Sequence, residues 1–260
     1  MVLSPHFDDA VFSLGATLAS AARSGASIHV VTIFGNDPDD ESAPSEWDAA
    51  CGFLSAGEAA RARREEDSLA CDLVGASATA LLFPDEDHGG GAEPAEISEA
   101  LTQACAGADL VLAPGYPLQH TDHAMVARLL VERRPGAGLG FYVEQPYATW
   151  RMLGRGRRTW AAPGLTIGRS IRYAGAMALR SRAARQLQRP RLPDDLSTAL
   201  GDEPKWDSAA AARSDRLTKR RAVRAYASQL RGFGPLVPER MALYEHSWGG
   251  EAVGLMPGAP

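Results

Sequence analysis

The sequence contains few cysteines and no long apolar run. Its three cysteines are an odd number without CxxC spacing, so we expect no zinc knuckle and free thiols in a reducing compartment: Cys51, Cys71 and Cys105. The N-terminus carries no basic segment followed by an apolar one, and no stretch of about 18 apolar residues occurs. We therefore predict neither a signal peptide nor a membrane span, and we expect a cytoplasmic protein.

Basic residues are also scarce relative to acidic ones. The chain has 27 Lys and Arg against 32 Asp and Glu, a formal charge of −5, which argues against a nucleic-acid binder. Hydrophobic residues make up 45% and charged residues 23%, an ordinary composition for a globular chain that buries a core. A length of 260 residues suits one large α/β domain.

Arginine, in contrast, is concentrated in one place. The segment from Arg151 to Arg191 holds eleven arginines and no Asp or Glu, so only 16 of the 27 basic residues lie elsewhere. This arginine-rich segment is either a solvated insertion or a surface that recognises phosphate or carboxylate. A docking surface for a partner or an identical subunit is a third possibility, so an oligomer stays open.

Apolar runs alternate with segments of helical periodicity along the chain. We expect strands near 2–3, 28–34, 81–83, 110–113 and 139–143, and helices near 10–23, 59–74 and 95–106. Such alternation predicts an α/β, Rossmann-like fold, with a mostly parallel sheet and helices on both faces. Functional sites of these folds lie at the carboxyl ends of the strands.

Two polar clusters follow predicted strands. His6-Phe7-Asp8-Asp9 comes directly after the first strand, and His120-Thr121-Asp122-His123 follows the strand at 110–113 after a turn. We expect both clusters at the same edge of the sheet. Histidine and aspartate suit a catalytic zinc ion, which takes three protein donors and keeps one position open for water. The structural alternatives are a helix cap at Asp8 or Asp9 and a surface pair at His120 and His123.

The chemistry of a zinc site distributes roles among these residues. We expect the zinc ligands to be His6, Asp9 and His123. Asp8 is then free to act as general base, and His120 faces the open position, where it can stabilise a developing oxyanion. Asp122 can orient a histidine. Iron or cobalt would tolerate the same ligands, so another divalent metal stays open.

Together these motifs resemble the PIG-L/LmbE-like family of zinc-dependent N-deacetylases. SPHFDDAVFSLG resembles the family's (A/S)-H-P-D-D-E motif, and HTDH resembles its H-x-D-H motif. Segments 63–75 and 219–229 resemble its R-x-x-E and K-x-x-A…SQ helices. The resemblance implies the same ligands and base, with His120 stabilising the tetrahedral intermediate and Asp122 tuning it. Phe7 and Ala10 replace the motif proline and glutamate. We expect one such domain over residues 1–260, with the arginine-rich segment inside it.

The resemblance implies a zinc-dependent amide hydrolase. We expect it to remove an N-acyl group, first of all acetyl, from an amino sugar or a natural-product intermediate containing one. The loop 36–57 and the turn 115–119 should wall the pocket, with substrate contacts at Trp47, Tyr116 and Arg64. The substrate would be anionic if the arginine-rich segment reaches the pocket. Two alternatives stay open: an amidase for a thiol conjugate or another non-sugar amide, and a metal-stabilised binding protein without turnover.

Overall fold

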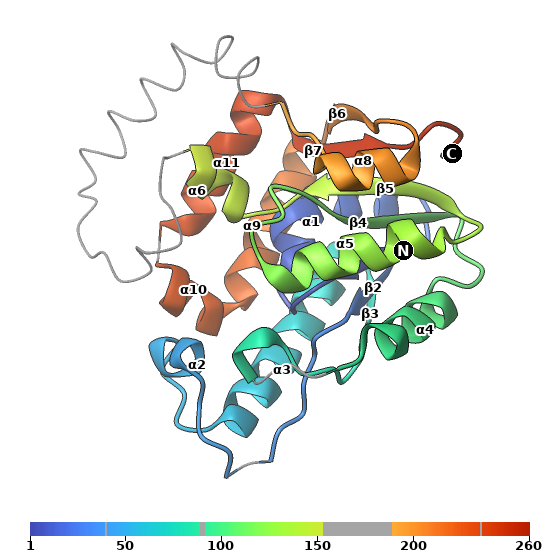
Figure 1. Ribbon diagram of the computed structural model, residues 1–260. Coiled ribbons are helices and arrows are strands. Elements are labelled where there is room, and N and C mark those ends of the chain that lie inside the picture. The colour runs from blue at the N-terminus through green and yellow to red at the C-terminus, as the bar shows by residue number, and fades with distance from the viewer. Residues whose placement is uncertain (40, 89–91, 153–188, 235) are drawn as a thin grey trace.

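A seven-stranded sheet forms the centre of the computed structural model, which describes residues 1–39, 41–88, 92–152, 189–234 and 236–260 (Figure 1). The strand order is β3-β2-β1-β4-β5-β7-β6. The strands are β1 Val2–Ser4, β2 His29–Thr32, β3 Ser77–Ala80, β4 Leu110–Tyr116, β5 Gly138–Val143, β6 Lys205–Ala209 and β7 Glu251–Leu255. Strands β1 to β5 pair in parallel, whereas β7 is antiparallel to both β5 and β6.

Helices cover both faces of this sheet (Figure 1). Their bounds are α1 Asp9–Arg23, α2 Glu46–Ala50, α3 Ala56–Val74, the 3-10 helix η1 Glu86–His88, α4 Pro94–Ala104, α5 Thr121–Arg133, α6 Tyr147–Met152, α8 Asp194–Leu200, α9 Arg213–Ala225, α10 Ala227–Phe233 and α11 Val237–Trp248. Helices α1, α3 and α9 pack together on one face, and α4, α5 and α8 lie on the other. The predicted Rossmann-like, mostly parallel fold is confirmed.

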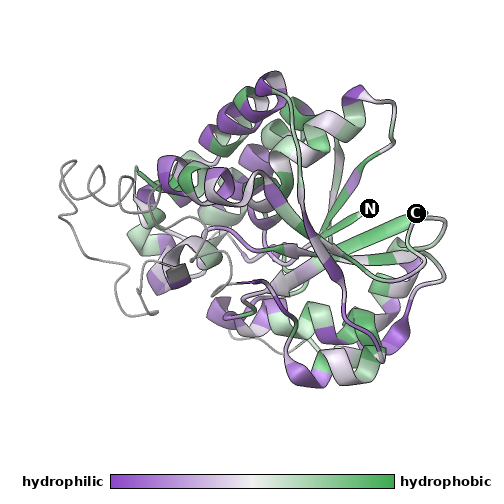
Figure 2. Ribbon diagram, turned by 90° about the horizontal axis from the view of Figure 1, so that it is seen from above, coloured by the Kyte–Doolittle hydropathy of each residue, from purple (hydrophilic) through white to green (hydrophobic). Residues whose placement is uncertain are grey.

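Alternating residues of the inner strands pack into two hydrophobic cores, one on each face of the sheet. Val30 and Leu112 belong to the core under α1, α3 and α9, while their neighbours Val31 and Val111 belong to the core under α4 and α5. This is the two-residue period expected of strands buried on both faces. Figure 2 shows the hydrophobic colour along the central strands and much of the hydrophilic colour on the surrounding helices.

One strand lies elsewhere than predicted. The apolar run at 81–83 is not a strand of the sheet; β3 is Ser77–Ala80, and Leu82 makes only an isolated bridge with Phe34. Because β3 is an edge strand with mostly exposed side chains, its sequence, SATA, lacks the apolar signal of an inner strand.

The expectations for the arginine-rich segment and for membrane spans can be compared with the described residues only in part. Most of the arginine-rich segment, residues 153–188, lies outside them, so its interpretations remain predictions. Within the described ranges, every helix is too short or too polar to cross a bilayer. The three cysteines are free and buried.

Candidate metal centre and cavity

The turn between β1 and α1 places the first polar cluster. Ser4, at the end of β1, accepts a hydrogen bond from the Ala10 N–H through its hydroxyl oxygen (3.0 Å). The His6 N–H donates to Asp9 Oδ2 at 2.8 Å. Asp8 occupies the N-cap position, yet its side chain makes no capping hydrogen bond. Ser4 and Asp9 therefore serve the start of the helix, and the Asp8 carboxylate is left available for other chemistry.

Three donor atoms converge above this turn. His6 Nδ1 lies 3.3 Å from Asp9 Oδ2, Asp9 Oδ2 lies 3.2 Å from His123 Nε2, and the two nitrogens are 3.2 Å apart. Donors placed tetrahedrally at about 2.0–2.1 Å from a zinc ion lie about 3.3 Å from one another. The triangle therefore has the size that a tetrahedral metal site requires.

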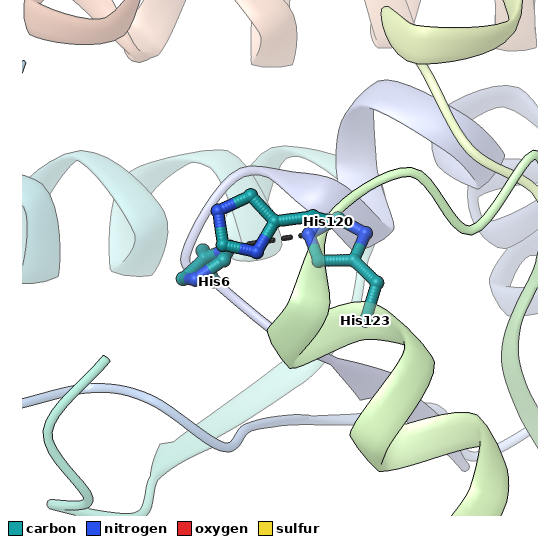
Figure 3. Close-up of side chains that lie close together, drawn as sticks. All are labelled: His6, His120 and His123. Atoms are coloured by element: carbon teal, nitrogen blue, oxygen red, sulfur yellow. Dashed lines mark hydrogen bonds between the residues drawn. The ribbon is translucent and has the colours of Figure 1, made fainter. Parts of the chain in front are cut away.

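A third imidazole completes the group. Donor atoms of His6, His120 and His123 all lie within 4.8 Å of one another, and Figure 3 shows the three rings close together, with a dashed line joining His6 and His123. His6 comes from the loop after β1, and the other two come from the start of α5, which follows the adjacent strand β4. These three histidines could hold a metal ion. The two predicted polar clusters thus meet at one edge of the sheet.

Two carboxylates fix which ring nitrogens face the centre. Asp122 Oδ2 lies 3.0 Å from His6 Nε2, and Glu144 Oε1 lies 2.5 Å from His123 Nδ1. Each carboxylate accepts a hydrogen bond from its imidazole N–H, so in the neutral rings the lone pairs of His6 Nδ1 and His123 Nε2 point at each other and at Asp9. Three electron-rich atoms at this separation repel unless a proton or a metal ion lies between them. Burial favours neutral rings, but the neighbouring carboxylates raise the pKa of His6 and raise that of His123 to about 9, so the pocket attracts positive charge. The chemistry of the donor set therefore fits a divalent metal.

The titratable groups in this centre differ in their preferred charge. Burial, with Asp9 as neighbour, raises the pKa of Asp8 to about 7. Burial acts to raise the pKa of Asp9 too, but His123 and His6 hold that pKa well below its usual range. Burial, with His6 and His123 nearby, lowers the pKa of His120 to about 3. The pKa values of the adjacent carboxylates Asp8 and Asp9 are thus shifted in opposite directions, and His120 stays neutral near pH 7.

Asp122 lies closer to His6 than to His120. Its Oδ2 is 3.0 Å from His6 Nε2 but 3.7 Å from His120 Nδ1. His120 is the N-cap of α5 and accepts the backbone N–H of Asp122 through Nδ1 at 3.3 Å. The carboxylate of Asp122 therefore orients His6, a residue of the donor triangle. The backbone N–H of Asp122, not its carboxylate, fixes the tautomer of His120.

A cavity of about 660 Å³ opens onto this centre. His6, Asp8 and His120 lie in its wall. Five aromatic side chains line it: Phe7, Phe34, Trp47, Tyr147 and Phe233. Four further carboxylates line it as well: Glu46, Asp85, Glu86 and Asp87. Arg63 also lines the cavity, and its Nη2 lies 2.6 Å from the buried carboxylate of Asp48.

The predicted substrate contacts differ in position. Trp47 lines the cavity, with its Nε1 donating to Gln229 Oε1 at 2.9 Å. Arg64 does not line it: its Nη2 donates to the Asn36 carbonyl at 3.2 Å. Tyr116 does not line it either, because it packs in a small apolar cluster beside β5. The loop 36–57 forms part of the wall as expected, whereas the turn 115–119 contributes no lining residue.

Glu144 was not expected in the centre. It follows β5, and its side chain is fully buried against His123. The rule that located the two motifs, polar residues at carboxyl ends of inner strands, applies equally to Glu144 and could have found it. The cavity carboxylates near η1 follow the strand predicted at 81–83, so the same rule would have marked them as well.

Comparisons with known proteins extend these observations. The chain is 33% identical over 171 residues to the 2'-N-acetylparomamine deacetylase of Streptomyces fradiae, over 58% of this chain and 58% of that protein. The match therefore spans less than two thirds of that curated relative's length.

Solved structures share the fold. The A40926 pseudoaglycone deacetylase Dbv21 superposes with a TM-score of 0.70 at 23% identity, covering 98% of this chain and 94% of that one. The zinc-inhibited form of teicoplanin deacetylase Orf2 also gives 0.70, at 19% identity, covering 98% and 96%. Residues 1–133 match the PIG-L family, described as GlcNAc-PI de-N-acetylase, which confirms the resemblance seen in the motifs. Since that match covers more than half of its 260 residues, the chain belongs to the PIG-L family.

Proposed function

We propose that this protein is a metal-dependent N-deacylase that removes an acetyl group from an amino sugar. The observation that carries the proposal is the triangle formed by His6 Nδ1, Asp9 Oδ2 and His123 Nε2, with edges of 3.2–3.3 Å, beside a cavity that Asp8 also lines. Family membership and the deacetylase from Streptomyces fradiae support the reaction type.

The three triangle residues would hold the metal. A divalent ion bound there would lower the pKa of a water molecule to about 7 and polarise the amide carbonyl. Zinc suits two imidazoles and one carboxylate, and iron and cobalt accept the same donors. Because Orf2 has been solved in a zinc-inhibited form, the metal is best identified by reconstituting metal-free protein with each ion separately.

The remaining residues would move protons. Asp8 takes a proton from water as the water oxygen bonds to the carbonyl carbon of the amide. His120 accepts a hydrogen bond from the Asp122 N–H at Nδ1, so its own N–H is at Nε2 and can donate a hydrogen bond to the developing oxyanion. When the carbon–nitrogen bond breaks, Asp8 returns the proton to the leaving amine. The products are a carboxylate, acetate for an acetyl substrate, and a free amino sugar.

The cavity lining favours a positively charged sugar. Aromatic side chains from α2, α6 and α10 can stack on a sugar face. The carboxylates of Glu46, Glu86 and Asp87 can pair with ammonium groups. The lining cations Arg63 and His88 already have carboxylate partners, Arg63 in Asp48 and His88 in Asp85 and Asp48. An aminocyclitol glycoside with free amines fits this lining, in line with the name of the Streptomyces relative. The described lining thus offers less to the anionic substrate that the arginine-rich segment suggested.

The experiment is acetate release from a panel of N-acetylglucosamine derivatives. The panel contains the neutral sugar, its 1-phosphate, a nucleotide-linked form, and cationic aminocyclitol glycosides. We expect release that depends on added metal and is fastest with the cationic members. Asp8→Asn should slow it about 10²–10⁴-fold, while Asp72→Asn, at an exposed position of α3, should leave it unchanged. A metal-loaded protein that cleaves no panel member would refute the proposed substrate class.

Two alternatives have distinct signatures. An amidase for a thiol conjugate would release acetate, or another carboxylate, from a non-sugar amide with the same metal dependence. A binding protein without turnover would retain a panel member unchanged in equilibrium dialysis. We also propose a cytoplasmic location, which the three buried free thiols support.

A further inference from the structure

Glu144 joins two parts of the site through one buried carboxylate. It comes directly after β5, and its exposed fraction is 0%. Both of its oxygens accept short hydrogen bonds, Oε1 from the His123 ring at 2.5 Å and Oε2 from the Leu118 backbone at 2.6 Å. A buried carboxylate is costly unless both oxygens are satisfied, and here both partners belong to the site or to the turn leading into it.

The first contact fixes a residue of the donor triangle. With its Nδ1–H held by Glu144, the His123 ring presents Nε2 toward His6 and Asp9. A carboxylate in this position makes an imidazole a stronger metal donor and holds its plane. Asp122 does the same for His6 at 3.0 Å, so each histidine of the triangle has its own carboxylate.

The second contact fixes the turn that delivers His120. Leu118 has a φ of +48°, a conformation that residues other than glycine rarely adopt, and its N–H points to Glu144. The backbone N–H of Glu144 also donates to the Tyr116 carbonyl at 2.6 Å. Two residues beyond Leu118, His120 is the N-cap of α5. Glu144 therefore holds the turn at Leu118 against β5.

We propose that Glu144 is a positioning residue that sets metal affinity through His123 and the placement of His120 through Leu118. The proposal rests on the proposed function, because it takes His123 as a metal ligand. Glutamine cannot replace both contacts: its one carbonyl oxygen can accept from His123 or from Leu118, and its NH₂ group must then face the other N–H.

The test compares Glu144→Gln and Glu144→Asp with the wild type and with Tyr142→Phe. Tyr142 lies on β5, is equally buried, and donates its hydroxyl to the Leu3 carbonyl at 2.9 Å, so its variant loses a buried hydrogen bond outside the donor set. Zinc is titrated into each metal-free protein in competition with a chromophoric chelator. We expect affinity about 10–100-fold weaker for both Glu144 variants and unchanged for Tyr142→Phe. The wild type should also show a downfield His123 ring N–H proton resonance that Glu144→Gln lacks.

Each outcome decides one part of the proposal. Folded Glu144 variants that bind zinc as tightly as the wild type would overturn it. Weaker binding with an unchanged kcat at saturating metal would overturn the part that concerns His120. A wild type that binds no zinc, iron or cobalt would instead refute the proposed function. Glu144→Asp keeps the charge but shortens the reach, so it supplies the comparison if Glu144→Gln does not fold.

Discussion

Replacing Glu251 by alanine should destabilise the fold strongly, at a position remote in sequence from every site motif. Glu251 begins β7 and is 3% exposed. Its carboxylate accepts from the backbone N–H groups of Ala16 and Thr17 in α1, at 3.0 and 2.7 Å, and from the Thr17 hydroxyl at 2.6 Å. Lys219 of α9 donates to it at 2.6 Å. One side chain therefore connects the sheet to two helices.

The size of the effect follows from what the change leaves behind. The Lys219 ammonium is buried, and Gly15 provides the space for its side chain, since a Cβ there would lie 2.9 Å from Lys219 Cγ. Lys219 would keep its contact with Glu245 at 2.5 Å but lose the other of its two carboxylate partners. Removing one member of a buried ion pair costs about 3–5 kcal/mol. At about 2–4 °C per kcal/mol for a chain of this size, the midpoint of thermal unfolding should fall by roughly 6–20 °C.

The assay is thermal unfolding followed by circular dichroism, with Glu239→Ala as control. Glu239 also pairs with basic residues of α9, Arg224 at 3.2 Å and Arg220 at 3.6 Å, but its side chain is 42% exposed. Exposed pairs contribute about 0–1 kcal/mol, so the control should lose at most about 4 °C. Equal losses for the two variants would refute the argument that burial, not pairing alone, makes Glu251 important.

Three further predictions concern the site. Asp8→Asn should retain the metal in a competition titration yet lose about 10²–10⁴-fold in kcat, and an unchanged rate would exclude Asp8 as general base. His123→Ala should contain no metal by elemental analysis after dialysis, whereas an exposed His246→Ala control should retain it. Hydrogen bonds that the His88 ring donates to the carboxylates of Asp48 and Asp85 raise the pKa of His88 to about 10. The contribution of protonated His88 to the free energy of unfolding is therefore complete below pH 6.5 and is lost as pH rises toward 10. In urea unfolding, the difference in free energy of unfolding between the wild type and His88→Gln should shrink between those pH values. A difference that stays constant would contradict the raised pKa of His88.

How much of the fold and of the candidate site the sequence predicts depends on the physical origin of each sequence pattern. Inner parallel strands are buried on both faces, so their apolar runs are conspicuous, and the polar residues just after β1 and β4 could be assigned to one sheet edge. The edge strand β3 and the antiparallel strand β6 have exposed or mixed side chains, so neither has such a run. Helical periodicity in the sequence also does not predict which of two neighbouring residues faces the cavity. Neighbouring helix residues point about 100° apart, which is why Arg63 lines the cavity where Arg64 was expected.

Contacts between distant segments lie beyond any local pattern. Glu144 meets His123 across 21 residues, and His88 meets Asp48 across 40. Sequence spacing gives the chemical type of these groups but not their partners, because the partners are set by how strands β4 and β5 and the loops around α2 and η1 come together.

The donor triangle has a consequence for how the chain withstands unfolding. Its two histidines are 117 residues apart, on segments that follow the neighbouring strands β1 and β4. An ion held by both would act as a reversible staple between the beginning and the middle of the chain, closing a loop whose ends drift apart once the sheet opens. Such an ion stabilises only the folded chain, by RT ln(1 + [M]/Kd), or about 2.7 kcal/mol at a hundredfold excess of free ion over Kd. Metal supply during synthesis would then govern how much intact protein a cell accumulates as well as how active each molecule is.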